Sequence, residues 1–187
     1  MNVVPDLVLT NGHVFDLSYK GVPYAMPAQY YRNLGQARFE EVTSRTLGPF
    51  FQQKSVGRGL ARLDWNRDGR EDFVVSHMNS PAALVENQTQ PIGHFIVIQL
   101  RGVQSSRDAI GAVVEVVAGE RTRVQQLTAG DGYQASNERR LVFGLGELTD
   151  IQELRVRWPS AVTQVLGALP VDREFWLVEG QSIREKR

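Results

Sequence analysis

The sequence contains no cysteine among its 187 residues. Disulfide frameworks, thiolate zinc sites, iron–sulfur clusters and cysteine nucleophiles are therefore excluded. It also has no excess of one charge, because 21 Lys and Arg balance 21 Asp and Glu. No apolar run approaches the roughly 18–20 residues of a membrane-spanning helix, and the first residues do not resemble an export signal. We therefore expect neither a nucleic-acid partner nor insertion into a membrane.

Helical periodicity is also missing, because no apolar pattern keeps a 3.6-residue repeat over a helical length. Short segments rich in Val, Ile, Leu and aromatic residues instead alternate with clusters of Gly, Asn, Asp and Pro, which is typical of strands and turns. We predict an all-β fold, with a short helix over Pro27–Asn33 as an open alternative. The clearest predicted strands are Asp6–Thr10, Asp72–Ser76, Phe95–Leu100, Ala112–Val117, Thr122–Leu127, Leu141–Phe143, Leu154–Trp158, Val162–Leu166 and Phe175–Val178.

The first half of the chain contains a weak internal repeat. Pro5–Thr10 aligns with Glu71–Ser76, and Tyr31–Asn33 aligns with Val85–Asn87 when the first copy carries an insertion around Tyr19–Pro27. Repeats built from short strands are typical of propeller blades, each of which packs on its neighbours. On this alignment the chain begins part-way through a repeat, so we expect a fragment of a longer parent.

The repeat stops near Pro91, and about seven predicted strands follow. This length and strand number are typical of a small β-sandwich. The predicted organisation is a partial β-propeller-type repeat region over residues 1–90, a small antiparallel β-sandwich over residues 91–180 and a charged tail over residues 181–187. Because two repeats leave strand edges open, a homodimer through those edges is one expected assembly.

One loop, Asp64–Asp72, places oxygen-bearing side chains at alternate positions, turns at Gly69 and then returns another carboxylate. Calcium takes six to eight oxygen ligands, and alternate residues of a tight loop can point inward together. We therefore predict a Ca²⁺ site of structural role. The predicted ligands are the side chains of Asp64, Asn66, Asp68 and Asp72 and the backbone carbonyl of Arg70.

Three alternatives exist for this loop. A helix–loop–helix calcium site would have Glu at its twelfth position, where Val75 stands, and magnesium prefers a smaller, water-rich octahedron. The third alternative is a plain turn in which Asp side chains accept hydrogen bonds from backbone amides. No base lies near the loop in the sequence, so a catalytic metal is not expected.

Other motifs give weaker signals for chemistry, and we predict no catalytic residue and no enzyme activity. The concentrated candidates for a catalytic cluster would be Arg107, Asp108, Asp131 and Glu138. Ser105–Asp108 is more typical of a polar turn, and Gly144–Gly146 is more typical of a bend after a strand than of a dinucleotide loop. Trp158, Trp176 and Tyr133 could form a sugar-stacking platform, but large aromatic residues in a small sandwich usually pack in the core.

Several motifs together resemble a known family. In the first half these are Asn11–Val14, Tyr31–Gly35, Arg38–Val42 and Arg58–Ala61, followed by the Asp64–Asp72 loop. In the second half they are Ser106–Ala112, Gly130–Tyr133, Phe143–Gly146 and Trp158–Ser160. The chain resembles the C-terminal part of cartilage-acidic-protein-like proteins, in which FG-GAP/VCBS-type propeller repeats precede an ASPIC/UnbV domain.

The resemblance implies calcium in the propeller loop and, more loosely, an extracellular or cell-envelope parent. Three positions depart from the family pattern: Asn66 stands where Asp is usual, Ala161 where Gly is common, and Val3 where the turn Gly of the shortened loop before Asp6 would be, so no ion is expected in that first loop. The expected function is a non-enzymatic, calcium-binding scaffold or recognition module with a protein or glycan partner. The alternatives are an accessory protein of enediyne-type natural-product biosynthesis, or a carbohydrate-binding module that uses the terminal domain.

Overall fold

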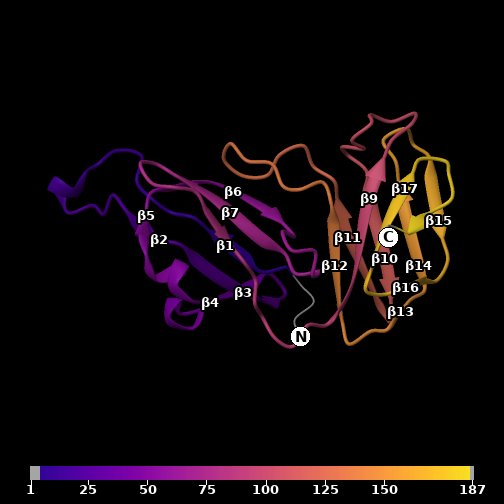
Figure 1. Ribbon diagram of the computed structural model, residues 1–187, viewed down its shortest axis with the longest axis horizontal. Coiled ribbons are helices and arrows are strands. Elements are labelled where there is room, and N and C mark those ends of the chain that lie inside the picture. Colours follow the sequence, from indigo (N-terminus) through magenta and orange to yellow (C-terminus); the bar gives the residue numbers. More distant parts are fainter. Residues whose placement is uncertain (1–4, 186–187) are drawn as a thin grey trace.

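The computed structural model describes residues 5–185 and confirms the all-β prediction. Its helical elements are three 3₁₀ segments, η1 (Ser18–Lys20), η2 (Ser44–Thr46) and η3 (Pro49–Gln52), and none of the helices in the described part could cross a membrane. The strands form two regions that lie end to end along the molecule (Figure 1). Strands β1–β8 pair with one another and strands β9–β18 pair with one another, and we name these the N-terminal region and the β-sandwich.

Eight short strands make up the N-terminal region. They are β1 (Leu7–Leu9), β2 (Met26–Pro27), β3 (Gln29–Gly35), β4 (Arg38–Glu41), β5 (Lys54–Ser55), β6 (Gly57–Leu63), β7 (Asp72–His77) and β8 (Ala83–Val85). They pair as two three-stranded sheets, β1-β3-β4 and β6-β7-β8, and as the two-stranded pair β2-β5. These strands form no closed ring of blades within the described residues.

The two copies of the predicted repeat carry equivalent hydrogen bonds. Asp6, just before β1, accepts a hydrogen bond from the backbone N–H of Asn33 at 2.7 Å, and Asp72 accepts the corresponding bond from Asn87 at 2.7 Å. The side-chain amide of Asn33 donates to the Pro5 carbonyl, and that of Asn87 donates to the equivalent carbonyl one residue before Asp72. The alignment found in the sequence therefore joins structurally equivalent positions.

The β-sandwich consists of ten strands. They are β9 (His94–Arg101), β10 (Val113–Ala118), β11 (Arg121–Gln126), β12 (Leu141–Gly146), β13 (Asp150–Ile151), β14 (Glu153–Arg157), β15 (Thr163–Leu166), β16 (Leu169–Pro170), β17 (Arg173–Val178) and β18 (Arg184–Glu185). One sheet has the order β11-β10-β14-β15 and the other β12-β9-β17-β18. Strands β9 and β17 run in the same direction and form a parallel pair. The sandwich is therefore not purely antiparallel, in contrast to the prediction from the sequence.

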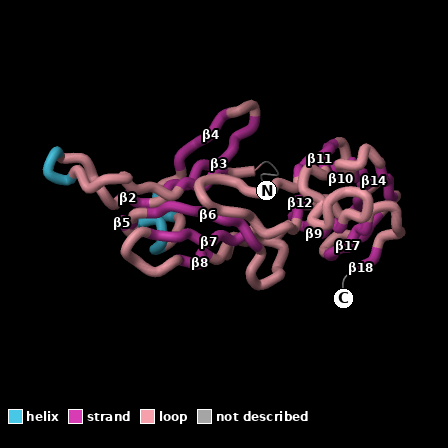
Figure 2. Tube along the Cα trace, turned by 90° about the horizontal axis from the view of Figure 1, so that it is seen from above, coloured by secondary structure: helices cyan, strands magenta, loops and turns pink. Residues whose placement is uncertain are grey.

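The two main sheets of the β-sandwich enclose a continuous hydrophobic core. Alternate residues of β10, β14 and β17 are buried, and Ile96, Val114, Phe143, Leu154 and Leu177 are each at most 1% exposed. Period-two alternation therefore places one apolar face of each sheet against the other. Figure 2 shows the β-sandwich from above, with the labels of β10, β11 and β14 on one side and those of β9, β17 and β18 on the other.

Two local predictions were wrong. The segment Pro27–Asn33 is not a helix, because it forms the end of β2 and most of β3, and β3 pairs with β1 on one side and β4 on the other. Pairing with neighbouring strands determines the conformation of this segment, and its aromatic residues pack well on the pleated surface of a sheet. Gly144–Gly146 is not a bend after a strand, because it lies within β12, with a register shift between the two glycines and Leu145 in the core.

Candidate metal site

The Asp64–Asp72 loop connects β6 to β7 and folds back on its own backbone. Asp64 and Asp72 are only 2% and 1% exposed. The carboxylate of Asp64 accepts hydrogen bonds from the N–H groups of Asp68 and Gly69 at 3.0 and 3.1 Å. Gly69 adopts a φ of +82°, a left-handed conformation in which glycine is least strained. The first and last carboxylates of the loop are therefore buried and held by backbone amides.

Asp68 and Asn66 complete the loop on its more exposed side. The amide of Asn66 donates to Asp68 Oδ2 at 2.8 Å, and the backbone N–H of Arg70 donates to Asp68 Oδ1 at 2.9 Å. The guanidinium of Arg70 also pairs with Asp68. Partial burial acts to raise the pKa of Asp68, but the hydrogen bonds from Arg70 and Asn66 and the charge of Arg70 outweigh it and lower the pKa.

These contacts bear on whether the loop can hold calcium. Its side chains supply hard oxygen donors, which suits the ion, and two of them are buried within the loop. Each carboxylate nevertheless accepts hydrogen bonds from N–H groups, as in the plain-turn alternative, and no three His, Asp or Glu side chains among residues 5–185 are already arranged around a common metal position. The ligand set Asp64, Asn66, Asp68, Arg70 and Asp72 therefore stays a prediction.

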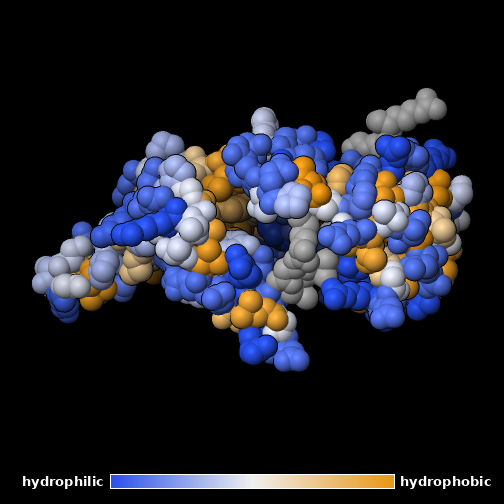
Figure 3. All heavy atoms as spheres, turned by 90° about the horizontal axis from the view of Figure 1, so that it is seen from below, coloured by the Kyte–Doolittle hydropathy of each residue, from blue (hydrophilic) through white to orange (hydrophobic). Residues whose placement is uncertain are grey.

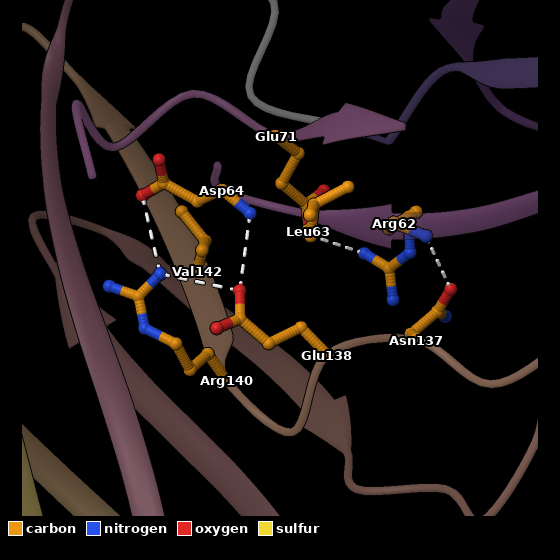
Figure 4. Close-up of a pocket in the computed structure, with 8 residues that line it drawn as sticks. All are labelled: Arg62, Leu63, Asp64, Glu71, Asn137, Glu138, Arg140 and Val142. Atoms are coloured by element: carbon orange, nitrogen blue, oxygen red, sulfur yellow. Dashed lines mark hydrogen bonds and ion pairs between the residues drawn. The ribbon is translucent and has the colours of Figure 1, made fainter. Parts of the chain in front are cut away.

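A buried arginine from the β-sandwich reaches this loop. Arg140 precedes β12, its side chain is 4% exposed, and its Nη1 lies 3.5 Å from Asp64 Oδ2 and 3.5 Å from Glu138 Oε2 (Figure 4). Its Nη2 lies 2.9 Å from Glu174 Oε2 on β17. Burial acts to lower the pKa of Arg140, but the hydrogen bonds and charges of Glu174, Glu138 and Asp64 outweigh it and raise the pKa. One cation thus connects the loop with β17 and with the segment that precedes β12.

Backbone contacts reinforce the same junction. The N–H of Arg62 on β6 donates to Asn137 Oδ1 at 2.8 Å, and the N–H of Glu138 donates back to the Arg62 carbonyl at 2.9 Å. A side chain at Gly69 would come within 2.4 Å of the Phe95 ring, so the loop packs directly on β9. A cavity of about 10 Å³ between the two regions has room for a single water. The loop is therefore part of the contact between the N-terminal region and the β-sandwich.

The candidates for a catalytic cluster do not converge. Asp108 forms an exposed ion pair with Arg139, whereas Asp131 accepts hydrogen bonds from Thr128 and Asn137. Glu138 lies at the junction described above, and Arg107 is exposed on its turn. These side chains line no common pocket among those found in the described part of the chain.

The three aromatic candidates for a sugar platform are also separate. Trp158 is 3% exposed and lies in the core, where its Nε1–H donates to Gln164 at 3.2 Å. Trp176 and Tyr133 are 39% and 63% exposed, and they belong to different parts of the chain, Trp176 to β17 and Tyr133 to the segment between β11 and β12. A platform that includes Trp158 is therefore ruled out by its burial.

Sequence reasoning missed a third buried carboxylate, Glu179, which follows β17. Its Oε2 accepts hydrogen bonds from the successive N–H groups of Val103, Gln104 and Ser105 at 2.7–2.8 Å, and Oε1 accepts from the hydroxyls of Ser105 and Ser160. Burial acts to raise the pKa of Glu179, but the hydrogen bonds from Ser160, Ser105 and Val103 outweigh it and lower the pKa to about 2. This carboxylate fixes two loops at one end of the sandwich.

A comparison with protein families found a match in the second half of the chain. Residues 102–184 match the family model described as ASPIC and UnbV, whereas a comparison with curated proteins found no match. The matched span begins just after β9, although β9 supplies a central strand of the same hydrophobic core. The chain therefore contains an ASPIC and UnbV domain, formed by residues 102–184 of the β-sandwich.

Proposed function

We propose that this protein is a non-enzymatic scaffold or recognition module in which calcium, bound by the Asp64–Asp72 loop, stabilises the contact between the N-terminal region and the ASPIC/UnbV domain. The observation that carries the proposal is the position of Asp64. Its buried carboxylate belongs to a loop with four oxygen-bearing side chains and also lies against Arg140 of the β-sandwich. An ion in this loop would stabilise both the turn and the junction.

The side chains that would hold the ion are those of Asp64, Asn66, Asp68 and Asp72, together with the Arg70 carbonyl. When bound, calcium would act structurally, as a divalent charge that holds these oxygens together. The Asp68 carboxylate would exchange its pairing with the Arg70 guanidinium for the ion. The side chain of Arg70 is 16% exposed, and its Nη1 also donates to the Thr89 carbonyl at 3.5 Å, a contact that does not involve Asp68.

A calcium role is also consistent with FG-GAP/VCBS-type repeats in the N-terminal region and with an extracellular or cell-envelope parent. Extracellular calcium modules work at dissociation constants of about 10⁻⁴–10⁻³ M. A ligand set with three carboxylates and nearby arginines suits that range better than that of a tight intracellular buffer, because cations near the ion reduce its affinity. The partner of the module would be a protein or glycan.

Calcium titration into chelator-treated protein, followed by calorimetry and thermal unfolding, tests the proposal. At free calcium 100 times the dissociation constant, the folded state should gain about 2.7 kcal/mol. Asp68→Ala should abolish both the heat of binding and the shift in Tm, whereas Asp108→Ala, which removes an exposed carboxylate in an ion pair with Arg139, should leave both unchanged. Absence of heat and of any Tm shift in the unaltered protein would contradict the proposal.

A further inference from the structure

A projecting loop at the far end of the N-terminal region carries large apolar side chains into solvent. This loop, residues 12–25, is named the arm, and it extends away from the body of the molecule in both views (Figures 1 and 2). Val14, Phe15 and Tyr19 are 67%, 71% and 78% exposed. The arm overlaps the predicted insertion of the first repeat over residues 19–25, whereas Val14 and Phe15 lie before it.

The arm is internally hydrogen-bonded. The N–H of His13 donates to the Tyr24 carbonyl at 2.9 Å and joins the two sides of the arm. At the tip, Asp16 accepts from the N–H of Ser18 at 3.0 Å, and the 3₁₀ segment η1 closes on Gly21. At the base, the guanidinium of Arg58 donates to the His13 carbonyl at 3.0 Å. The exposed apolar tip is thus presented by an ordered element, which reduces the entropic cost of binding.

A groove lies where the arm joins the body. Its volume is about 430 Å³, and its apolar walls are formed by Met26, Pro27, Ala28, Val42 and Leu47. Its polar lining consists of Asn11, Gln29, Glu41, Thr43 and Ser44. Figure 3 shows the N-terminal region from below, with apolar surface gathered around a hollow. The arm and the groove are therefore adjacent features of one surface.

The tip of the arm and the groove also carry side chains of opposite charge. The tip carries Lys20, which lies 5.5 Å from the centre of the Tyr19 ring, and the groove carries Glu41. Neither Lys20 nor Glu41 belongs to an ion pair among residues 5–185. Because Asp16 balances Lys20 at the tip, the arm has no net positive charge that would attract an anionic lipid surface.

We propose that the arm binds the groove of a second copy of this chain, so that two copies exchange arms. A two-fold arrangement requires a self-complementary surface, and a surface that carries both the arm and its groove meets that requirement. Phe and Tyr side chains bury about 150–250 Å² each when fully buried, and Phe15 and Tyr19 are 71% and 78% exposed, so the four rings of two arms supply about 450–750 Å². The groove walls that cover them add a similar area, and the total of about 900–1,500 Å² overlaps the lower part of the roughly 1,200–2,000 Å² of a stable interface.

Sedimentation equilibrium of the full chain over a range of concentrations tests the exchange. The unaltered protein should approach the mass of a dimer, and Phe15→Asp with Tyr19→Asp should weaken dimerisation on the order of 100-fold. Val124→Asp is the matched control, because Val124 is 56% exposed on the β-sandwich, far along the chain from the arm, and this change should leave the mass unchanged.

A charge exchange tests the orientation of the arm in the groove. Lys20→Glu and Glu41→Lys should each weaken dimerisation, and the double variant should restore it. A monomer at every concentration, or a dimer that persists in the Phe15→Asp, Tyr19→Asp variant, would overturn the proposal. Binding to phosphatidylcholine vesicles that is lost in the same variant, with the free protein monomeric, would also overturn it and assign the tip to a membrane surface. These readouts do not depend on calcium, so they are separate from the test of the metal loop.

Discussion

The β-sandwich and the N-terminal region are stabilised in different ways. Seventeen buried hydrophobic residues form one cluster in the sandwich, whereas the described part of the N-terminal region has four buried hydrophobic residues, Ala28, Phe51, Val56 and Val75. The smaller region compensates with aromatic edge contacts, such as Phe50–Phe51 at 5.3 Å and Phe51–Phe73 at 6.2 Å, and with buried polar loops. Burial of apolar surface is the dominant stabilising contribution to folding. We therefore infer that the stability of the N-terminal region depends on the β-sandwich more than the stability of the β-sandwich depends on the N-terminal region.

The largest expected effect comes from emptying the sandwich core. Phe143→Ala, at a residue 1% exposed, should lower the free energy of unfolding by about 3–5 kcal/mol. Hydrogen exchange should show lower protection in β9, β12 and β17 and also in β6 and β7, because β12 follows directly from the junction residue Arg140.

The matched change is Phe51→Ala, in the aromatic cluster of the N-terminal region. It should lower protection in β3 and β7 and leave the β-sandwich protected, because no core residue of the sandwich belongs to this cluster. Equal loss of protection in both regions after Phe51→Ala would show that the two regions unfold as one unit, and would remove the asymmetry inferred here.

Two neighbouring arginines test the junction itself. Arg140→Met removes a cation whose side chain is 4% exposed and leaves Asp64, Glu138 and Glu174 without it, so the free energy of unfolding should fall by about 3 kcal/mol. Arg139→Met removes an exposed cation that pairs with Asp108, and the change should be about 0–1 kcal/mol. Urea unfolding of the two variants measures the difference, and similar losses would show that Arg140 adds nothing beyond a surface charge.

A smaller effect is expected from Glu179, which acts within the sandwich alone. Its pKa of about 2 in the folded protein lies below the ordinary value of 4.5, so folding favours the charged form. The stability it contributes is complete above about pH 4.5 and is lost as the pH falls towards 2. Glu179→Gln should cost about 1–3 kcal/mol at pH 7 and should flatten the pH dependence of unfolding between pH 4.5 and 2. If the pH dependence of unfolding between pH 4.5 and 2 were unchanged in this variant, the contribution assigned to Glu179 would be contradicted.

The sequence predicted the strands and the repeat because both depend on local patterns. Short apolar runs located β9 and β10, period-two alternation located β14, and the shared Asp and Asn positions of the two repeats proved to be equivalent hydrogen-bonding positions. The loop Asp64–Asp72 could be singled out for the same reason, since all its oxygen-bearing side chains lie within nine consecutive residues. Calcium binding by this loop remains a prediction. The spacing of the ligands does not determine whether the carboxylates bind an ion or accept hydrogen bonds from the backbone amides of the loop.

Other features could not be found in this way, because their partners lie far apart in the chain. Arg140 contacts Asp64 across 76 residues, and Glu179 accepts hydrogen bonds from a loop 74–76 residues earlier. A lone arginine or glutamate in a sequence is normally a solvated surface charge, so nothing local distinguishes these two. The parallel pairing of β9 with β17 was missed for a related reason, since strand direction depends on the path of the intervening chain.

The amino-acid sequence by itself determined the all-β class, the places of most strands and the oxygen-rich turn before β7. These follow from side-chain alternation and turn chemistry, which act over a few residues. Only the tertiary structure decided that the turn lies against the β-sandwich, that Arg140 is buried between three carboxylates and that the arm stands clear of the body beside a groove. Those outcomes depend on how two regions pack, and packing is set by long-range contacts that no short segment of the sequence contains.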